Sequence, residues 1–191
     1  MQLILASTSK YRRELLARLR LPFTSLAPQV DEEPFKNCGA TPASIASLLA
    51  RLKAESLSGF DPDAVIIGSD QVAEVDGQVL SKPGTAEKAI TQLERLSGRE
   101  HRLHTGIAIW HRFRCQLHVD TTTLCMRTLQ RAEIERYVEL DQPLDCAGSY
   151  KVESLGVSLF ESIQSSDQTA IVGLPLIAVS TMLRQIGFQV P

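Results

Sequence analysis

Residues 64–71 constrain the fold most, because they join an apolar run directly to a polar cluster. Residues 64–67 are all apolar, and Gly68, Ser69, Asp70 and Gln71 follow at once. Such a run predicts a strand buried on both faces of a sheet. In open α/β sheets, ligand crevices form where strands of this kind end. The sequence therefore predicts an α/β fold with a site that includes Asp70, the alternative being that Asp70 only caps a turn.

An anion site is predicted near the N-terminus. Residues 3–6 predict a short buried strand, residues 7–9 all carry hydroxyls that favour a helix N-cap, and a helix is expected over 10–19. The free N–H groups and positive dipole end of such a helix attract anions. Arg12 and Arg13 support this, because cations in a first turn are unfavourable unless an anion is bound there. Alternatively, both arginines lie on a solvated face.

Acidic and basic residues further along the chain can complete such a site. Three acidic residues at 31–33 follow a predicted strand over 23–27. They are expected in a loop, either solvated or binding a divalent cation. Lys53 lies at the border of the apolar face of a helix predicted over 41–58, so its ammonium reaches either a pocket or solvent. Lys82 precedes a proline that fixes the chain direction.

The remaining elements follow from periodicity and turn residues. They are a hairpin at 75–79, a helix at 86–96, an antiparallel pair at 105–110 and 116–126, a helix at 131–140, a polar loop at 145–151, a short strand at 157–159 and a C-terminal helix opened by 173–175. The sequence has no repeat or linker, so residues 1–191 are predicted to form one domain, with two lobes as an option.

Composition narrows the functional classes. The formal net charge is -2, which gives no electrostatic footprint for nucleic acid. The cysteines and histidines lack metal-ligand spacing, and Cys38, Cys115, Cys125 and Cys146 are expected to be reduced and mostly buried. The apolar N-terminal stretch is too short for a signal peptide, and no run approaches the roughly 20 residues of a membrane span. We therefore expect a cytoplasmic protein without a membrane partner.

Several motifs occur together in a fixed order. They are residues 5–9 with 12–16, residues 30–32, Lys53 with Ala54, residues 68–71, Lys82 with Pro83, residues 97–98 with 105–106, residues 147–151 and residues 172–176. In this order they resemble the Maf family of nucleotide pyrophosphatases over nearly the whole chain. The resemblance implies an elongated mixed sheet with flanking helices, similar to inosine-triphosphate pyrophosphatases, and a cleft between two lobes.

The resemblance also implies a reaction and its residues. The reaction is hydrolysis of a nucleoside triphosphate to the monophosphate and diphosphate, with Mg²⁺ or Mn²⁺ as cofactor. The residues implied to line the triphosphate are Ser7, Arg12, Arg13, Lys53 and Lys82. Glu32 and Asp70 are implied to bind the metal and activate water, with Asp70 as the proton acceptor, so that the catalytic set is Asp70, Lys53, Lys82 and Glu32.

Three positions indicate which branch of the family the chain resembles. Tyr11, Gln71 and Glu153 stand where the pyrimidine-preferring branch has arginine, threonine and glutamine, and together they resemble the branch that prefers 7-methyl-GTP. An aromatic face attracts the cationic methylated base, and a carboxylate can accept from both donors of guanine. The alternatives are that Tyr11 packs on its own helix, that Glu153 is a surface charge, and that dTTP or UTP is the substrate.

Two other classes of protein are alternatives. A nucleotide-binding regulator of septum formation with little turnover would not need both Asp70 and Glu32. A phosphatase of the aspartyl-phosphate type would need a second aspartate where Val72 stands. The apolar C-terminal helix would permit a homodimer, although a core helix has the same pattern.

Overall fold

The computed structural model describes residues 1–36 and 39–190 and contains a seven-stranded mixed sheet. The strand order is β2-β1-β3-β5-β6-β7, and β4 pairs with β3. The strands are β1 (Leu3–Ala6), β2 (Thr24–Leu26), β3 (Val65–Val75), β4 (Gln78–Leu80), β5 (Glu100–His111), β6 (Arg114–Met126) and β7 (Phe160–Gln164). The α-helices are α1 (Lys10–Ala17), α2 (Glu33–Lys36), α3 (Pro42–Glu55), α4 (Ala86–Leu96), α5 (Arg131–Asp141) and α6 (Leu176–Ile186). Two 3₁₀ helices, η1 (Leu155–Leu159) and η2 (Ala170–Val172), complete the described elements.

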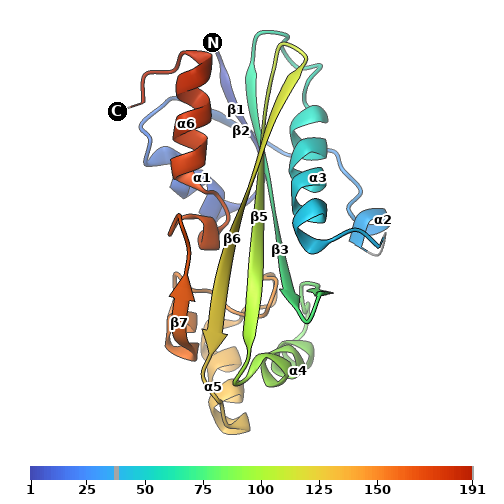
Figure 1. The fold of residues 1–191 in the computed structure, drawn as a ribbon, viewed down its shortest axis with the longest axis vertical. Helices are drawn as coiled ribbons and strands as arrows, with labels where there is room; N and C mark the ends of the chain where they lie inside the picture. Colours follow the sequence, from blue (N-terminus) through green and yellow to red (C-terminus); the bar gives the residue numbers. More distant parts are fainter. Residues whose placement is uncertain (37–38, 191) are drawn as a thin grey trace.

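The molecule is elongated, and helices flank the sheet in two groups, as predicted. Figure 1 shows β3, β5 and β6 running along most of its length, with α1, α3 and α6 around the upper part and α4 and α5 at the lower end. Separate apolar cores correspond to these groups. Leu16, Ile67 and Val179 belong to the core of the upper lobe, whereas Leu93 and Ile134 belong to that of the lower lobe.

Strand β3 carries an open stretch of edge. It pairs in parallel with β1 as far as Gly68, and antiparallel with β4 from Ala73 onward. Between these points the same edge has no strand partner among the described residues, while the other edge pairs with β5 throughout. The prediction that the strand ends before Asp70 is therefore wrong, because Asp70 lies in the middle of β3. The strand that does end here is β1, at Ala6.

Helix α3 packs unusually close to the sheet because glycines face it. A Cβ built on Gly68 would overlap the carbonyl oxygen of Ala50, and one built on Gly106 would overlap that of Ala46. Periodicity predicts a buried face of Ile45, Leu48, Leu49 and Leu52. Ile45 and Leu49 are buried, but Leu48 and Leu52 are only half-buried, and the small residues Ala46, Ala50 and Ala54 are buried in addition. This close approach brings Lys53 over β3.

Helix starts are confirmed, and some connecting segments are not as predicted. Ser9, Thr41 and Thr85 cap α1, α3 and α4 with their side chains. Within the predicted acidic loop, residues 33–36 form the short helix α2. The predicted strand at 157–159 is part of η1, and β7 starts only at residue 160. Gly156, within η1, lies so close to the backbone of Lys151 that a Cβ there would overlap its carbonyl oxygen.

The cysteine and membrane predictions are tested in part. Cys115, Cys125 and Cys146 are free thiols and half-buried, so they are more exposed than expected, and Cys38 lies outside the described residues. Among the helices described, none combines the length and the apolar character that crossing a membrane requires.

Candidate active site

A cleft of about 1000 Å³ lies along the open edge of β3. The start of α1, the end of α3, strand β4 and the loop after α5 form its walls. It brings together most of the residues that sequence predicted for a site, namely Ser7, Tyr11, Arg12, Glu32, Lys53, Asp70, Gln71, Lys82 and Glu153. Arg13 is the exception, because it is exposed and is not among the lining residues. One step of about 100° around α1 turns it away from Arg12.

At one end of the cleft a buried lysine bridges two carboxylates. The Lys53 ammonium lies 2.5 Å from Asp70 Oδ1 and 2.7 Å from Glu32 Oε1. Lys53 and Asp70 are each only 7% exposed. The side chain of Lys53 is thus buried while its ammonium group reaches the cleft, which is one of the two alternatives that the sequence predicted.

Arg12 completes this end of the cleft, held by a backbone carbonyl. Its Nε donates to the carbonyl oxygen of Gly173 at 2.9 Å, and the same oxygen accepts from Ser69 Oγ at 2.8 Å. Gly173 has φ +114°, in the range that favours glycine. We call Arg12, Glu32, Lys53 and Asp70 the buried end of the cleft.

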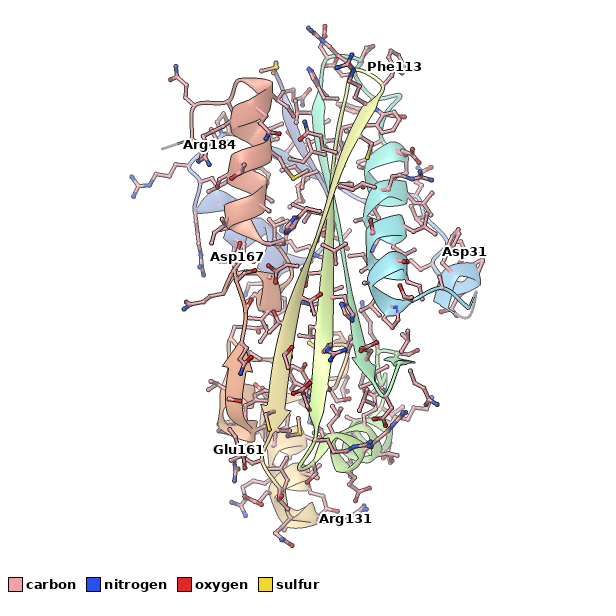
Figure 2. All side chains as sticks on the ribbon, in the orientation of Figure 1. Asp31, Phe113, Arg131, Glu161, Asp167 and Arg184 are labelled. Atoms are coloured by element: carbon pink, nitrogen blue, oxygen red, sulfur yellow. The ribbon has the colours of Figure 1, made fainter. Side chains whose placement is uncertain are left out.

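The loop that carries Gly173 is itself fixed by the start of α6. Asp167 accepts from the backbone and hydroxyl of Thr169 and from the backbone N–H of Ile177. Thr169 Oγ1 in turn accepts from Leu176 N–H, so both residues cap the helix. Figure 2 places Asp167 at the lower end of α6, beside the long strands. The position of the Gly173 carbonyl is therefore determined by a hydrogen-bonded network.

The electrostatics of the buried end centre on Asp70. Burial raises the pKa of this carboxyl above its usual value, while Lys53 and Arg12 act in the opposite direction. Burial also lowers the pKa of the Arg12 guanidinium. A carboxylate with a raised pKa is a stronger base than an exposed one, provided that it remains ionised. Asp70 is thus suited to accept a proton.

The start of α1 presents donors to the same region. Ser9 Oγ accepts from Arg12 N–H, and Ser7 Oγ accepts from Ser9 N–H at 3.1 Å. The N–H groups of Lys10 and Tyr11 precede the first intrahelical hydrogen bond, so they point out of the helix end. This is the geometry expected of an anion site.

Gln71 is committed to contacts within the protein. Its Nε2 lies within hydrogen-bond distance of Thr105 Oγ1 and of the carbonyl oxygens of Ala170 and Ile171, at 3.0 to 3.1 Å. Because carbonyl oxygens only accept, the amide nitrogen must face η2. Gln71 therefore ties η2 to the sheet, and any contact of Gln71 with a ligand would be made by its remaining oxygen.

At the other end of the cleft the residues are more exposed and come from both lobes. Tyr11 belongs to α1, whereas Asp145 and Glu153 lie in the loop after α5. Desolvation raises the pKa of Tyr11, and Glu153, Cys146 and Asp145 add to this shift. Burial also raises the pKa of Glu153, with smaller contributions from Asp141 and Asp145. We call Tyr11, Asp145 and Glu153 the open end of the cleft.

Lys82 lines the cleft as an exposed residue of the segment after β4.

Glu32 and Asp70 are the residues that could hold a divalent cation. Their carboxylate oxygens are the hard ligands that Mg²⁺ and Mn²⁺ prefer, and Lys53 holds both within reach of one another. In the described part of the chain, no group of three or more His, Cys, Asp or Glu side chains could hold a metal. A cation held by these two carboxylates would have to take its other ligands from water and from bound phosphates.

Sequence reasoning assigned no role to Ser69, Gly173 or Asp145. The carbonyl of Gly173 accepts from both Arg12 and the buried Ser69, and Asp145 belongs to the open end. Ser69 and Gly173 belong to motifs that were recognised, but a motif alone assigns no role to a carbonyl. Asp145 opens the polar loop predicted over 145–151, although its charge was not singled out there.

The fold and the cleft define an α/β protein of two lobes on one sheet, with cations, two carboxylates and a helix N-terminus gathered at one end of a cleft. A family model described as "Maf-like protein" matches residues 2–186. The chain belongs to this Maf family.

Relatives of similar length support the assignment. The 7-methyl-GTP pyrophosphatase of Xanthomonas axonopodis pv. citri (strain 306) is 52% identical over 191 residues, covering 100% of this chain and 99% of that protein. The protein of the same name from Bordetella pertussis (strain Tohama I) is 50% identical over 189 residues, covering 98% and 94% of the two chains. Among solved structures, the Ham1 protein of Staphylococcus aureus aligns with 67% of this chain and 73% of its own, at 15% identity and a TM-score of 0.49.

Proposed function

We propose that this chain hydrolyses 7-methyl-GTP to 7-methyl-GMP and diphosphate with a divalent cation, in the cytoplasm, and so removes modified nucleotides. The observation that carries the proposal is the placement of Asp70. It is a buried carboxylate in the middle of β3, at the open edge that forms the cleft, within 2.5 Å of Lys53. The names of the relatives support the choice of substrate.

The residues of the buried end suit the chemistry of attack on a phosphorus atom. Such an attack develops charge on the nonbridging and leaving oxygens, and positioned cations stabilise that charge. Arg12, Lys53 and Lys82 would supply them, together with the N–H groups at the start of α1. Asp70 would accept the proton of the attacking water. The diphosphate would then leave from the side of the cleft where these cations lie.

A divalent cation would be held by Glu32 and Asp70. When bound, it would supply Lewis-acid stabilisation of phosphate oxygens. The role of Lys53 in this scheme is to hold the two carboxylates together, because two unpaired carboxylates so close would repel one another and one would take up a proton.

The open end suits the base. Tyr11 can stack on a cationic purine ring, which contributes about 0.5–2 kcal/mol. The Glu153 carboxylate can accept from the N1–H and exocyclic amine of guanine, and these two donors have no equivalent arrangement on a pyrimidine. Gln71 would contribute mainly by fixing η2, through its contacts to Ala170 and Ile171.

The test is release of diphosphate from 7-methyl-GTP, GTP, dTTP and UTP with Mg²⁺ or Mn²⁺, comparing the wild type with Asp70→Asn. We expect preferential turnover of 7-methyl-GTP, reduced about 10³-fold or more in the variant. Preferential turnover of dTTP or UTP would contradict the assignment of the base. If none of the four nucleotides is turned over but one binds, the chain is a nucleotide-binding regulator instead.

A homodimer remains a prediction, which light scattering of the purified protein would test.

A further inference from the structure

We propose that Asp145 is a specificity-determining residue, whose unpaired carboxylate favours a positively charged purine over neutral guanine. The inference rests on the proposed function, since it concerns the base of the same substrate. It goes beyond that function because it assigns discrimination to long-range charge as well as to direct contact with the base.

The first observation is position. Asp145 lines the cleft together with Tyr11 and Glu153, and it enters from the lower lobe while Tyr11 enters from the upper one. A ring stacked on Tyr11 would thus lie in the field of both carboxylates. Desolvation raises the pKa of the Tyr11 phenol, and Glu153 and Asp145 both add to this shift.

The second observation concerns the ion pairs of the two carboxylates. Burial raises the pKa of Glu153, and Lys151 opposes this shift without pairing with Glu153 in the described structure. Within the part of the chain that the structure describes, neither Asp145 nor Glu153 forms an ion pair. The nearby Lys151 directs its ammonium to the backbone carbonyls of Asp141 and Gln142, at 2.9 and 3.1 Å. The two carboxylates of the open end therefore remain available to a positively charged ligand.

The two ends of the cleft differ in charge. At the buried end the cations Arg12 and Lys53 are balanced by the carboxylates Glu32 and Asp70, whereas the open end carries the carboxylates Asp145 and Glu153. 7-Methyl-GTP carries its positive charge on the base, which suits the open end. GTP has the same triphosphate but a neutral base, so only the open end can distinguish the two nucleotides electrostatically.

A structural role for Asp145 is modest and can be separated from its charge. Its Oδ1 accepts a weak hydrogen bond from the Cys146 thiol at 3.5 Å, and Asp145 itself is exposed. Asparagine keeps an oxygen acceptor of the same shape and removes only the charge. Asp145→Asn is therefore the informative variant, and Asp145→Glu should restore the preference.

The experiment measures kcat/KM for 7-methyl-GTP and for GTP in wild type, Asp145→Asn and Asp145→Glu. Glu139→Gln serves as the matched control, because Glu139 is an exposed acid of α5 in the same lobe and does not line the cleft. We expect Asp145→Asn to lower the ratio of kcat/KM for 7-methyl-GTP to kcat/KM for GTP about fivefold. The effect should shrink at 1 M salt, because the Debye length falls from about 10 Å at 0.1 M to about 3 Å.

A second measurement does not depend on turnover. Calorimetry with 7-methylguanosine and guanosine, which have no phosphates, compares the two bases directly. Weaker binding of 7-methylguanosine to Asp145→Asn, with guanosine unaffected, supports the inference even if no nucleotide is hydrolysed and the proposed function fails. Equal losses for both nucleosides and both nucleotides, or no change in the preference, would overturn it while leaving the hydrolytic function in place.

Discussion

The two ends of the cleft are built differently, and the difference separates chemistry from recognition. At the buried end, Lys53 of α3 and Asp70 of β3 form an ion pair where these two elements pack closely, and Arg12 of α1 donates to the carbonyl of Gly173. At the open end, Tyr11 and Asp145 come from different lobes and are partly exposed. Substitutions at the open end can therefore change the preferred base without disturbing the reacting groups. The predictions below test this separation.

The largest effect is expected at Lys53. Lys53→Met removes the cation that bridges Asp70 and Glu32, leaving two carboxylates to repel one another. We expect kcat/KM to fall about 10³-fold for 7-methyl-GTP and GTP alike, because both carry the same triphosphate. Lys88→Met, an exposed lysine of α4, is the control. A loss confined to one of the two nucleotides would contradict the separation of the two ends.

The packing beneath the buried end can be tested at Gly68. Gly68→Ala puts a methyl group against the carbonyl oxygen of Ala50, where only backbone movement could make room. We expect the free energy of unfolding to fall by about 3 kcal/mol, measured by urea denaturation. Gly59→Ala, in open space, should be nearly neutral. An unaffected Gly68 variant would mean that α3 is not fixed by this contact.

Acid should lower the stability of the protein through protonation of the buried His101. His101 is buried and hydrogen-bonded to Tyr150, which lines the cleft, and burial lowers its pKa to about 4. Because the unfolded state binds the proton first, stability present above about pH 6.5 should be lost as the pH falls toward 4. We expect about 2 kcal/mol less stability at pH 4.5 than at pH 7 from this residue. The measurement is urea denaturation of wild type and His101→Phe, whose stability should change less with pH; equal pH dependence would assign the loss to other groups.

Of the four effects predicted here, the smallest is expected at Glu153. Glu153→Gln keeps the shape of the side chain and removes a carboxylate that can accept two hydrogen bonds from guanine. We expect the preference for 7-methyl-GTP over dTTP to fall about tenfold, with Glu139→Gln unchanged. Measuring kcat/KM for both nucleotides decides this. A proportional fall for both substrates would place Glu153 in the chemistry rather than in recognition.

Sequence predicted the helices better than it predicted the sheet around the site. Hydroxyl caps such as Ser9 and Thr85 are local signals, so α1 and α4 begin where expected. The length of β3 was not predictable, because a polar cluster usually follows a strand and here lies within one. It is tolerated because the edge of β3 is open at that point, which depends on where β1 and β4 end.

Within the site, too, local features were predicted from the sequence, whereas contacts between distant segments were not. Residues whose type implies a charge role, such as Asp70 and Lys53, were identified from the sequence, and the structure brings them together. The contribution of Gly173 depends on a carbonyl that meets Arg12 across 161 positions of sequence. Asp145 likewise gains its significance only from a helix of the other lobe. Contacts of this kind leave no local pattern in the sequence.

The most direct measurement is a crystal structure with 7-methyl-GTP in which a methylene group replaces the oxygen between the α- and β-phosphorus atoms. The separation of the two ends predicts the phosphates beside Arg12, Lys53 and Asp70, with the methylated ring against Tyr11 and its donors within hydrogen-bond distance of Glu153. A nucleotide bound in the reverse direction, or outside the cleft, would contradict it.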